Sequence, residues 1–213
     1  NYYVKMKKEG DGDGRDWDNA MDGTDFATYL PLAPDGAIFY VAAGTYNPAY
    51  DVNLNTPSNT SGLCYTINSN VIIRGGYPAN AKGTDVPSDP KKYETVFDGD
   101  IKGDDVIDKS KAEDGYTSLE RSNLKDNVSN MFFSNVSIKQ NVEISGVVVK
   151  NTATNAYYFV SGNKKLVLRQ DSCVYTAGVV NMPITNANLE VYSCGVLSNV
   201  SNYVFNIPTT NNV

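Results

Sequence analysis

The feature that most constrains the fold is a short strand-and-turn pattern that repeats from residue 127 to residue 213. Its strand cores begin at Val142, Leu166, Leu189 and Val213, and these starting residues are 24, 23 and 24 positions apart. A second set of apolar residues precedes the cores at spacings of 26, 22 and 24, namely Phe132, Tyr158, Val180 and Val204. A unit of this length cannot bury its own apolar face, so a period in the twenties predicts a stacked array of coils.

Length and composition suit such an array. A chain of 213 residues, of which 41% are hydrophobic, is long enough to build one sizeable core in an elongated domain. The sequence contains no run of about 18 apolar residues, the length that a membrane-spanning helix needs. It begins with Asn1 and stops inside a coil at Val213. We therefore expect a mature or trimmed chain, with any secretory signal removed and the C-terminal cap missing.

Charge and residue content exclude several classes of function. The net charge is −6, from 18 basic and 24 acidic residues, and the isoelectric point is about 4.7. This balance argues against a nucleic-acid partner, because phosphate binding relies on clustered Lys and Arg. Histidine is absent, which removes Ser-His-Asp and Cys-His catalytic centres and the commonest zinc ligand. Any chemistry would rest on carboxylates, Lys, Arg, Tyr or a hard cation.

The cysteines leave two interpretations open. Cys64, Cys173 and Cys194 form an odd set without Cys-x-x-Cys spacing, which argues against a zinc site. Cys173 and Cys194 are 21 positions apart, roughly one repeat, and strands about 4.8 Å apart in adjacent coils would allow a disulfide. Buried thiols that pack as small apolar groups are the simpler interpretation.

A loop rich in glycine and aspartate follows a short opening strand at residues 2–6. Asp11, Asp13 and Asp16 alternate with glycines as in a calcium-binding loop, but the closing glutamate of an EF-hand is missing. The alternative is a turn in which Asp16 caps the helix that follows. The sequence therefore offers either a Ca²⁺ site or a helix cap here.

A helix is expected from Trp17 to about Leu30. Apolar residues recur there at steps of three and four, and Pro31 ends the pattern. The first coil of a stacked array exposes an apolar end and a strand edge that something must cover. This amphipathic helix is expected to be that cap.

Four motifs then occur in an order that resembles a known family. They are Gly-Asp-Gly-Arg-Asp-Trp-Asp-Asn-Ala at 12–20 and the three apolar strands with their turns at 38–46, 71–77 and 95–100. This order resembles the start of right-handed parallel β-helix proteins. More narrowly, it is similar to the pectin-lyase-like, polymorphic outer-membrane-protein-like surface proteins of Gram-negative bacteria. The resemblance covers about residues 1–100 by motif and 127–213 by repeat, and this fold carries lyases, hydrolases, adhesins and passenger domains alike.

The resemblance also implies where catalysis would lie. A lyase of this fold would hold Ca²⁺ on acidic residues and use a Lys or Arg to take the proton beside a uronate carboxylate, whereas a hydrolase would use paired aspartates. Asp98 and Asp100 lie at alternate positions of an extended segment and Asp104 and Asp105 follow closely, so the four are candidate Ca²⁺ ligands. An ordinary turn after a strand is the preferred alternative, and no Arg-x-x-Lys pair follows in matching coils.

Tyrosines and long loops are the candidate glycan contacts. The chain has 15 tyrosines, and the candidates lie at strand ends and in loops: Tyr46, Tyr50, Tyr77, Tyr93 and Tyr116. Tyrosines of the array could form an external aromatic ladder, although half-buried rings with surface hydroxyls are the simpler interpretation for each one. The loops at 78–92 and 102–126 are long enough that we expect specificity there. Asparagines near the turns are expected to adopt the left-handed conformation and to stack at the corners.

These observations predict an all-β chain, a right-handed parallel β-helix with an N-terminal capping helix. One domain is expected over residues 1–213, made of a strand and cap helix at 1–36, first coils with long loops at 37–126, and regular coils at 127–213. The expected function is a non-catalytic secreted or cell-surface module, adhesin-like or glycan-contacting, whose partner is a polysaccharide or a cell-surface glycan. A polysaccharide lyase or glycoside hydrolase, and a purely structural spacer, remain the alternatives.

Overall fold

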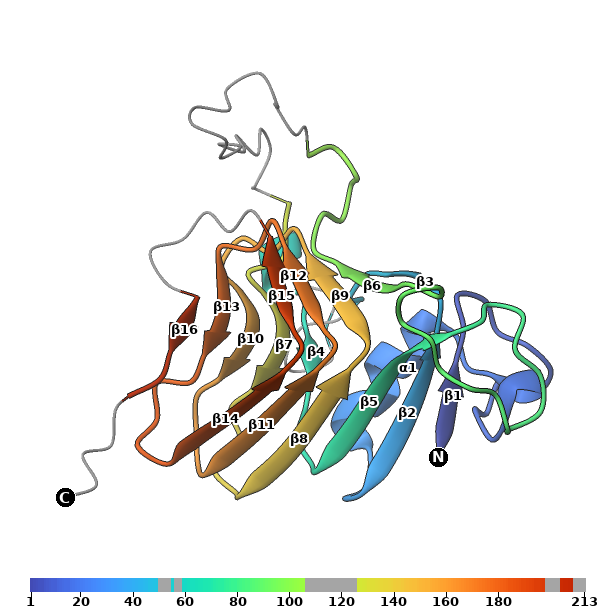
Figure 1. Cartoon of the computed structure of the whole chain (residues 1–213), viewed down its shortest axis with the longest axis horizontal. Helices are drawn as coiled ribbons and strands as arrows, with labels where there is room; N and C mark the ends of the chain where they lie inside the picture. Colours follow the sequence, from blue (N-terminus) through green and yellow to red (C-terminus); the bar gives the residue numbers. More distant parts are fainter. Residues whose placement is uncertain (50–54, 56–58, 106–125, 198–203, 209–213) are drawn as a thin grey trace.

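The strands of the protein form three sheets, and the strands within each sheet are parallel (Figure 1). The computed structural model describes residues 1–49, 55, 59–105, 126–197 and 204–208. Sheet A has the strand order β1-β2-β5-β8-β11-β14, sheet B has β3-β6-β9-β12-β15, and sheet C has β4-β7-β10-β13-β16. The described part of the chain is thus all-β with parallel strands and one short α-helix, and none of its helices is long and apolar enough to cross a membrane.

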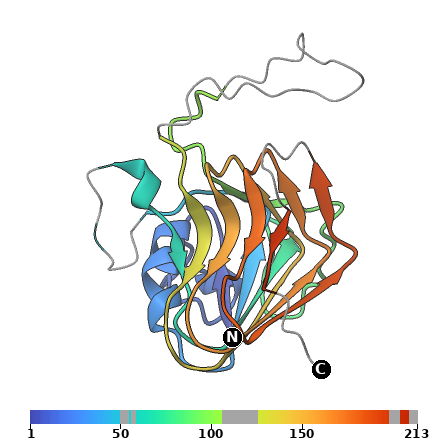
Figure 2. The same ribbon diagram turned by 90° about the vertical axis from the view of Figure 1, so that its left-hand side faces the viewer.

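The chain visits the sheets in the constant order A, B, C from β2 to β16, and from β5 on each strand pairs with its counterpart one turn earlier. Figure 2, seen along the stack, shows the three sheets around a common interior. The bounds in sheet A are β1 Tyr2–Val4, β2 Ala37–Ala42, β5 Val71–Tyr77, β8 Gln140–Ser145, β11 Lys164–Arg169 and β14 Ala187–Tyr192. Those in sheet B are β3 Gly44–Tyr46, β6 Thr95–Asp98, β9 Val147–Lys150, β12 Ser172–Val174 and β15 Gly195–Leu197. Those in sheet C are β4 Tyr65–Thr66, β7 Asn130–Ser134, β10 Asn155–Phe159, β13 Gly178–Asn181 and β16 Phe205–Asn206.

We call each predicted set of aligned apolar residues a column. The register confirms the first column, that of the strand cores, and corrects the second. Leu166 pairs with both Val142 and Leu189, as their spacing predicts, whereas Val213 lies outside the described residues. In the second column Phe132 pairs with Tyr157 rather than Tyr158.

Val180 of the second column pairs with Phe205 rather than Val204. The correction has a packing reason: the Tyr157 ring is buried and stacks on Phe132 with a centroid separation of 5.6 Å and an interplanar angle of 9°. Adjacent residues of a strand point to opposite faces, so a shift of one position exchanges inside for outside.

The helix expected from Trp17 to Leu30 is divided into three pieces. A 3-10 helix spans Trp17–Asn19, the α-helix α1 spans Gly23–Tyr29, and a second 3-10 helix spans Leu30–Leu32. The break has a cause: Met21 forms a bridge with Val4 of β1, and its backbone exchanges hydrogen bonds with Tyr3 and Lys5. Asp22 then caps α1 by accepting from two backbone N–H groups.

α1 covers one end of the interior, as expected of a cap. Its Phe26 ring contacts one aromatic residue from each sheet, with centroids 5.1 Å from Phe39, 5.4 Å from Tyr65 and 6.3 Å from Phe97. All four rings are fully buried. Because Phe26 touches all three sheets, the helix closes the first coil.

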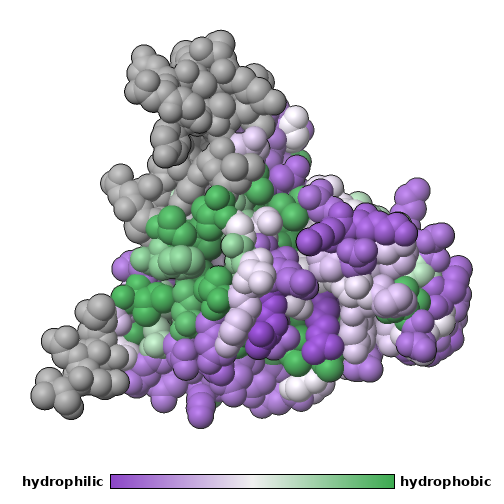
Figure 3. Space-filling model, viewed as in Figure 1, coloured by the Kyte–Doolittle hydropathy of each residue, from purple (hydrophilic) through white to green (hydrophobic). Residues whose placement is uncertain are grey.

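The opposite end of the stack differs. In the last described coil, residues of the inward-facing ladders are exposed, including Val191, Val196 and Phe205. Figure 3 shows apolar side chains gathered over these last coils, whereas the N-terminal region is mainly hydrophilic.

The corners between sheets hold residues in the left-handed conformation. Gly146, Gln170 and Ser193 occupy successive A-to-B corners with φ between 54° and 68°, and Asn151 and Tyr175 occupy B-to-C corners at 56°. Among the described asparagines, only Asn151 has a positive φ, so the predicted conformational role of asparagine is largely wrong.

The predicted stacking of asparagines between coils is confirmed. Side-chain amide hydrogen bonds join Asn155 to Asn130 at 2.7 Å and Asn186 to Asn163 at 2.8 Å. Each amide both donates and accepts, so a column of asparagines satisfies its members from one coil to the next.

Candidate functional site

The loop at residues 78–94 connects sheet A to sheet B in the second coil, and the N-terminal motif holds it in place. Asp18 Oδ2 accepts from Gly83 N at 2.8 Å, and Trp17 N donates to Gly83 O at 2.9 Å. The ammonium group of Lys5, which is buried, donates to Ala81 O at 2.8 Å. The motif at 12–20 therefore positions a long loop that the sequence marks as a place for specificity.

The end of this loop packs tightly on the A-to-B corner. A Cβ added at Gly146 would lie 2.7 Å from Pro90 Cγ, and one added at Gly76 would lie 2.7 Å from Pro90 N. Ser88 Oγ also donates to Gly75 O at 2.9 Å. Glycine is required here because both corner residues have positive φ and the loop backbone approaches them closely.

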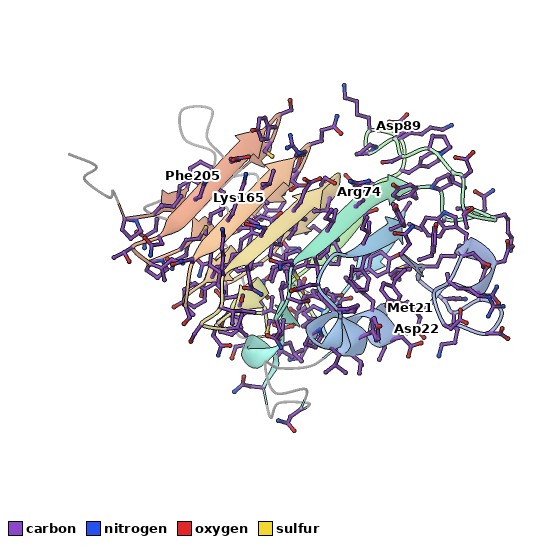
Figure 4. All side chains as sticks on the ribbon, turned by 90° about the horizontal axis from the view of Figure 1, so that it is seen from below. Met21, Asp22, Arg74, Asp89, Lys165 and Phe205 are labelled. Atoms are coloured by element: carbon purple, nitrogen blue, oxygen red, sulfur yellow. The ribbon has the colours of Figure 1, made fainter. Side chains whose placement is uncertain are left out.

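A polar cleft of about 680 Å³ lies between this loop and the corners of the following coils. One wall carries Ser88, Asp89, Lys91 and Glu94, and the other carries Gln170, Ser172 and Ser193. Figure 4 shows Asp89 in the loop beyond the end of β5, near Arg74. The cleft thus offers charged and hydroxyl groups along several successive coils.

The outer face of sheet A continues this surface as a row of five side chains, one from each strand from β2 to β14. The register aligns Tyr40, Arg74, Ser145, Arg169 and Tyr192. We call this row the outer stripe. Three of its members immediately precede the corner residues that border the cleft, so the stripe and the cleft are adjacent.

The two arginines of the stripe have different partners. Arg169 lies over the Tyr192 ring, 4.2 Å from its centroid, and 3.6 Å from Glu143. Asp171, two positions further along the chain, is buried and is not the ion-pair partner of Arg169. Arg74, in contrast, forms no ion pair with any residue that the structure describes. Within the described part of the chain it is thus the arginine of the stripe that has no ion pair, with Tyr40 and Ser145 on either side.

Asp171 lies beneath the cleft and is only 2% exposed. Its Oδ1 accepts from Val147 N at 3.0 Å, and its buried Oδ2 has the Tyr157 hydroxyl as its neighbour. Desolvation raises the pKa of Asp171 well above its usual range. The neighbouring Tyr157 hydroxyl is also buried, and desolvation followed by the charge of Asp171 raises its pKa. Asp171 is therefore a buried carboxyl in the lining of the cleft.

The first candidate Ca²⁺ loop is organised by an arginine. Arg15 Nη1 lies 2.7 Å from both Asp11 Oδ2 and Asp13 Oδ2, and its Nε lies 3.9 Å from Asp16 Oδ2. Asp16 also caps the 3-10 helix by accepting from Asn19 N at 2.8 Å. The helix-cap interpretation of Asp16 is confirmed, and the guanidinium occupies the position that a cation would take.

The second candidate loop separates its aspartates. Asp98 ends β6 and lies 3.0 Å from the Lys150 ammonium group, and its Oδ1 accepts from the Asn151 amide at 2.8 Å. Asp105 Oδ2 accepts from the Asn127 amide at 2.7 Å. The group whose ligand atoms all lie within 4.8 Å of one another is Asp100, Asp104 and Asp126. Asp98 and Asp105 are outside this group.

Two of the five tyrosines chosen as glycan contacts are buried. Tyr46 is buried, and its hydroxyl donates to Ala42 O at 3.0 Å. Tyr77 is buried beside Trp17, with ring centroids 5.3 Å apart, so neither ring can stack on a sugar. Tyr93 is partly exposed, with the Lys92 ammonium 4.9 Å from its ring centroid, whereas Tyr50 and Tyr116 lie outside the described residues.

The cysteines are free thiols. Cys64 and Cys173 are buried and Cys194 is partly buried. The register places Val196, rather than Cys194, opposite Cys173 in the next coil, so the disulfide alternative is not realised.

Comparisons with protein-family models, with curated proteins and with solved structures find no match to this chain. The candidate sites of the described residues are therefore the cleft, the outer stripe and the acidic group of Asp100, Asp104 and Asp126.

Sequence reasoning missed Asp126 and the arginines of the outer stripe. Asp126 is 26 positions after Asp100, and no local spacing links the two. Arg74 and Arg169 could have been found from the sequence. Each lies two residues after an outward-facing apolar residue of its strand, and side chains two residues apart in a strand point to the same face.

Proposed function

We propose that this chain is a right-handed parallel β-helix of the pectin-lyase-like kind and works as a secreted or cell-surface module that binds an acidic glycan. The observation that carries the proposal is the outer stripe beside the polar cleft. Five strands place Tyr40, Arg74, Ser145, Arg169 and Tyr192 in one row, so ligand groups can repeat along the stack.

The chemistry of the row suits a polymer that carries carboxylate or sulfate groups. Arginine donates in a planar fork that matches a carboxylate, and Arg74 has no competing ion pair in the described part of the chain. Strands of a sheet are about 4.8 Å apart, so five aligned side chains span roughly 19 Å, the length of several sugar units. Tyr192 is exposed at one end of the row, and because Arg169 covers one face of its ring, the opposite face is the one that can stack on a sugar.

The test is a binding panel of acidic and neutral polysaccharides, for example polygalacturonate against its methyl ester. We expect the wild-type chain to bind the acidic polymer and Arg74→Gln to weaken that binding at least tenfold. Lys7→Gln is the matched control, because Lys7 is exposed in the N-terminal loop, outside both the cleft and the stripe. Equal binding of the acid and the ester, or an equal loss in both variants, would refute the proposal.

The same panel separates the two alternatives. A lyase produces unsaturated sugar ends and a hydrolase produces new reducing ends, so turnover of any polymer would replace the binding module with an enzyme. A chain that neither binds nor cleaves any polymer of the panel would be a structural spacer.

A further inference from the structure

We propose that Asp100, Asp104 and Asp126 form a Ca²⁺ site that ties together the chain on the two sides of residues 106–125. This site lies at the B-to-C corner of the second coil, after β6 and before β7. It is separate from the cleft and the outer stripe, which border the A-to-B corners, and it does not depend on the proposed glycan function.

The spacing of the carboxylates fits one Ca²⁺ ion. Ca²⁺ binds oxygen ligands at 2.3–2.6 Å, so two oxygens that share an ion are at most about 5 Å apart. The ligand atoms of Asp100, Asp104 and Asp126 lie within 4.8 Å of one another. Asp100 and Asp126 form no ion pair with a Lys or Arg of the described residues, so like charges face one another there.

Backbone N–H groups fix the direction of two of these carboxylates. Asp100 Oδ1 accepts from Gly103 N at 2.7 Å, and its Oδ2 accepts from Asp105 N at 3.0 Å. Asp126 Oδ2 accepts from Lys102 N at 3.2 Å. The arrangement is therefore built by the fold rather than by a chance approach of flexible side chains.

A buried oxygen that lacks a partner points to a ligand. Asp126 is 3% exposed, yet its Oδ1 has no hydrogen-bond donor. Leaving a buried carboxylate oxygen unsatisfied is costly, and coordination to a cation would satisfy it. This oxygen belongs to one of the three grouped side chains.

Asn127 supplies a second oxygen of the same kind. It is fully buried, pairs with Asp100 through an antiparallel bridge, and donates its amide N–H to Asp105 Oδ2. Its Oδ1 is buried without a partner. A side-chain amide oxygen is a common Ca²⁺ ligand, and an all-oxygen group favours Ca²⁺ over the softer metals that prefer His or Cys.

The experiment is a calorimetric titration of the full chain with CaCl₂ after treatment with a chelator, with MgCl₂ as the second titrant. We expect one equivalent of Ca²⁺ to bind, with a dissociation constant on the order of 10⁻³ M or tighter. Asp126→Asn should weaken binding at least tenfold. Asp98→Asn and Asp11→Asn are the matched controls and should leave the affinity unchanged.

A second variant and a second readout distinguish loss of the Ca²⁺ site from loss of folding. Asp104 is exposed, so Asp104→Asn should remove a ligand without disturbing the core, and it should weaken binding at least tenfold as well. Ca²⁺ should raise the melting temperature of the wild-type chain and of the two controls, and of neither site variant. No binding to the wild-type chain, equal affinity for Mg²⁺, or an equal loss in Asp98→Asn would overturn the proposal.

Discussion

Two acidic stretches of this chain look alike in sequence and are stabilised in different ways. The loop at 10–16 and the turn at 98–105 both alternate aspartate with glycine. In the first, one guanidinium from the same loop lies between three aspartates. In the second, Lys150 pairs with Asp98, while Asp100 is held by backbone N–H groups and meets Asp126 from far along the chain.

Charge compensation and burial together, rather than the number of carboxylates, set how much an acidic loop can gain from a cation. Arg15 is four residues from Asp11 and is exposed, so its loop is a local and solvent-screened arrangement. Asp100 and Asp126 are both buried, and burial strengthens every charge interaction that involves them. A cation therefore has more to gain at the second site.

The largest effect that separates the two sites should come from Asp100→Ala. This change leaves the backbone N–H groups of Gly103, Asp104 and Asp105 without their acceptor. Hydrogen bonds to a charged group contribute about 1.5–3 kcal/mol, so we expect the free energy of unfolding to fall by about 2–3 kcal/mol.

Urea unfolding in the presence of a chelator measures this loss without the contribution of Ca²⁺. Asp11→Ala is the control, and its exposed ion pair should contribute too little to resolve. Equal losses in the two variants would show that burial does not distinguish the sites.

Asp171 adds a third way to hold a carboxyl, and it gives a pH dependence. No Lys or Arg of the described residues pairs with it, and burial raises its pKa in the folded state above the unfolded value of about 3.9. The stabilisation that the protonated carboxyl provides is complete below the unfolded pKa and is lost as the pH rises toward the folded pKa. The contribution of Asp171 to the stability should therefore fall as the pH increases above about 4.

Asp171→Asn should remove this slope. Asparagine keeps an oxygen that can accept from Val147 N and carries no charge at any pH. We expect the variant to be more stable than the wild type by about 1 kcal/mol at neutral pH, and the advantage to shrink toward pH 4. Chemical unfolding across this pH range measures it, and an advantage that is independent of pH would contradict the assignment to ionisation.

The fold could be predicted where the pattern is local and repeated. The column through Val142, Leu166 and Leu189 was predictable because each coil places the same apolar position inside, and the strand at 71–77 was predictable from its apolar run. The error between Tyr158 and Tyr157 arose because both are tyrosines, and the sequence does not show which ring faces inward. The division of the helix at Met21 depends on a bridge to Val4. The spacing of apolar residues along the helix does not reveal this bridge.

The candidate sites were less predictable because their residues meet through the coils. Asp100 and Asp104 are close in sequence, but Asp126 joins them only after an excursion of more than 20 residues. The outer stripe needs the register of five strands before its arginines align. Tyr46 and Tyr77 were chosen by their place at strand ends, and burial against the N-terminal elements excludes both.

The smallest expected effect, and the sharpest test of the comparison, is Arg15→Gln. Removing the guanidinium leaves Asp11, Asp13 and Asp16 to repel one another, but Asp11 and Asp13 are exposed to water and salt screens them. We expect a slight loss of thermal stability at low ionic strength that disappears at high ionic strength. Thermal melts at two salt concentrations measure this loss. Asp18→Asn, which removes the neighbouring exposed ion pair between Asp18 and Lys82, is the comparison variant. Ca²⁺ could raise the melting temperature of Arg15→Gln as much as is expected for the site of Asp100 and Asp126. An exposed loop would then bind Ca²⁺ as well as a buried one, and the charge of Arg15 would be the whole difference between the two sites.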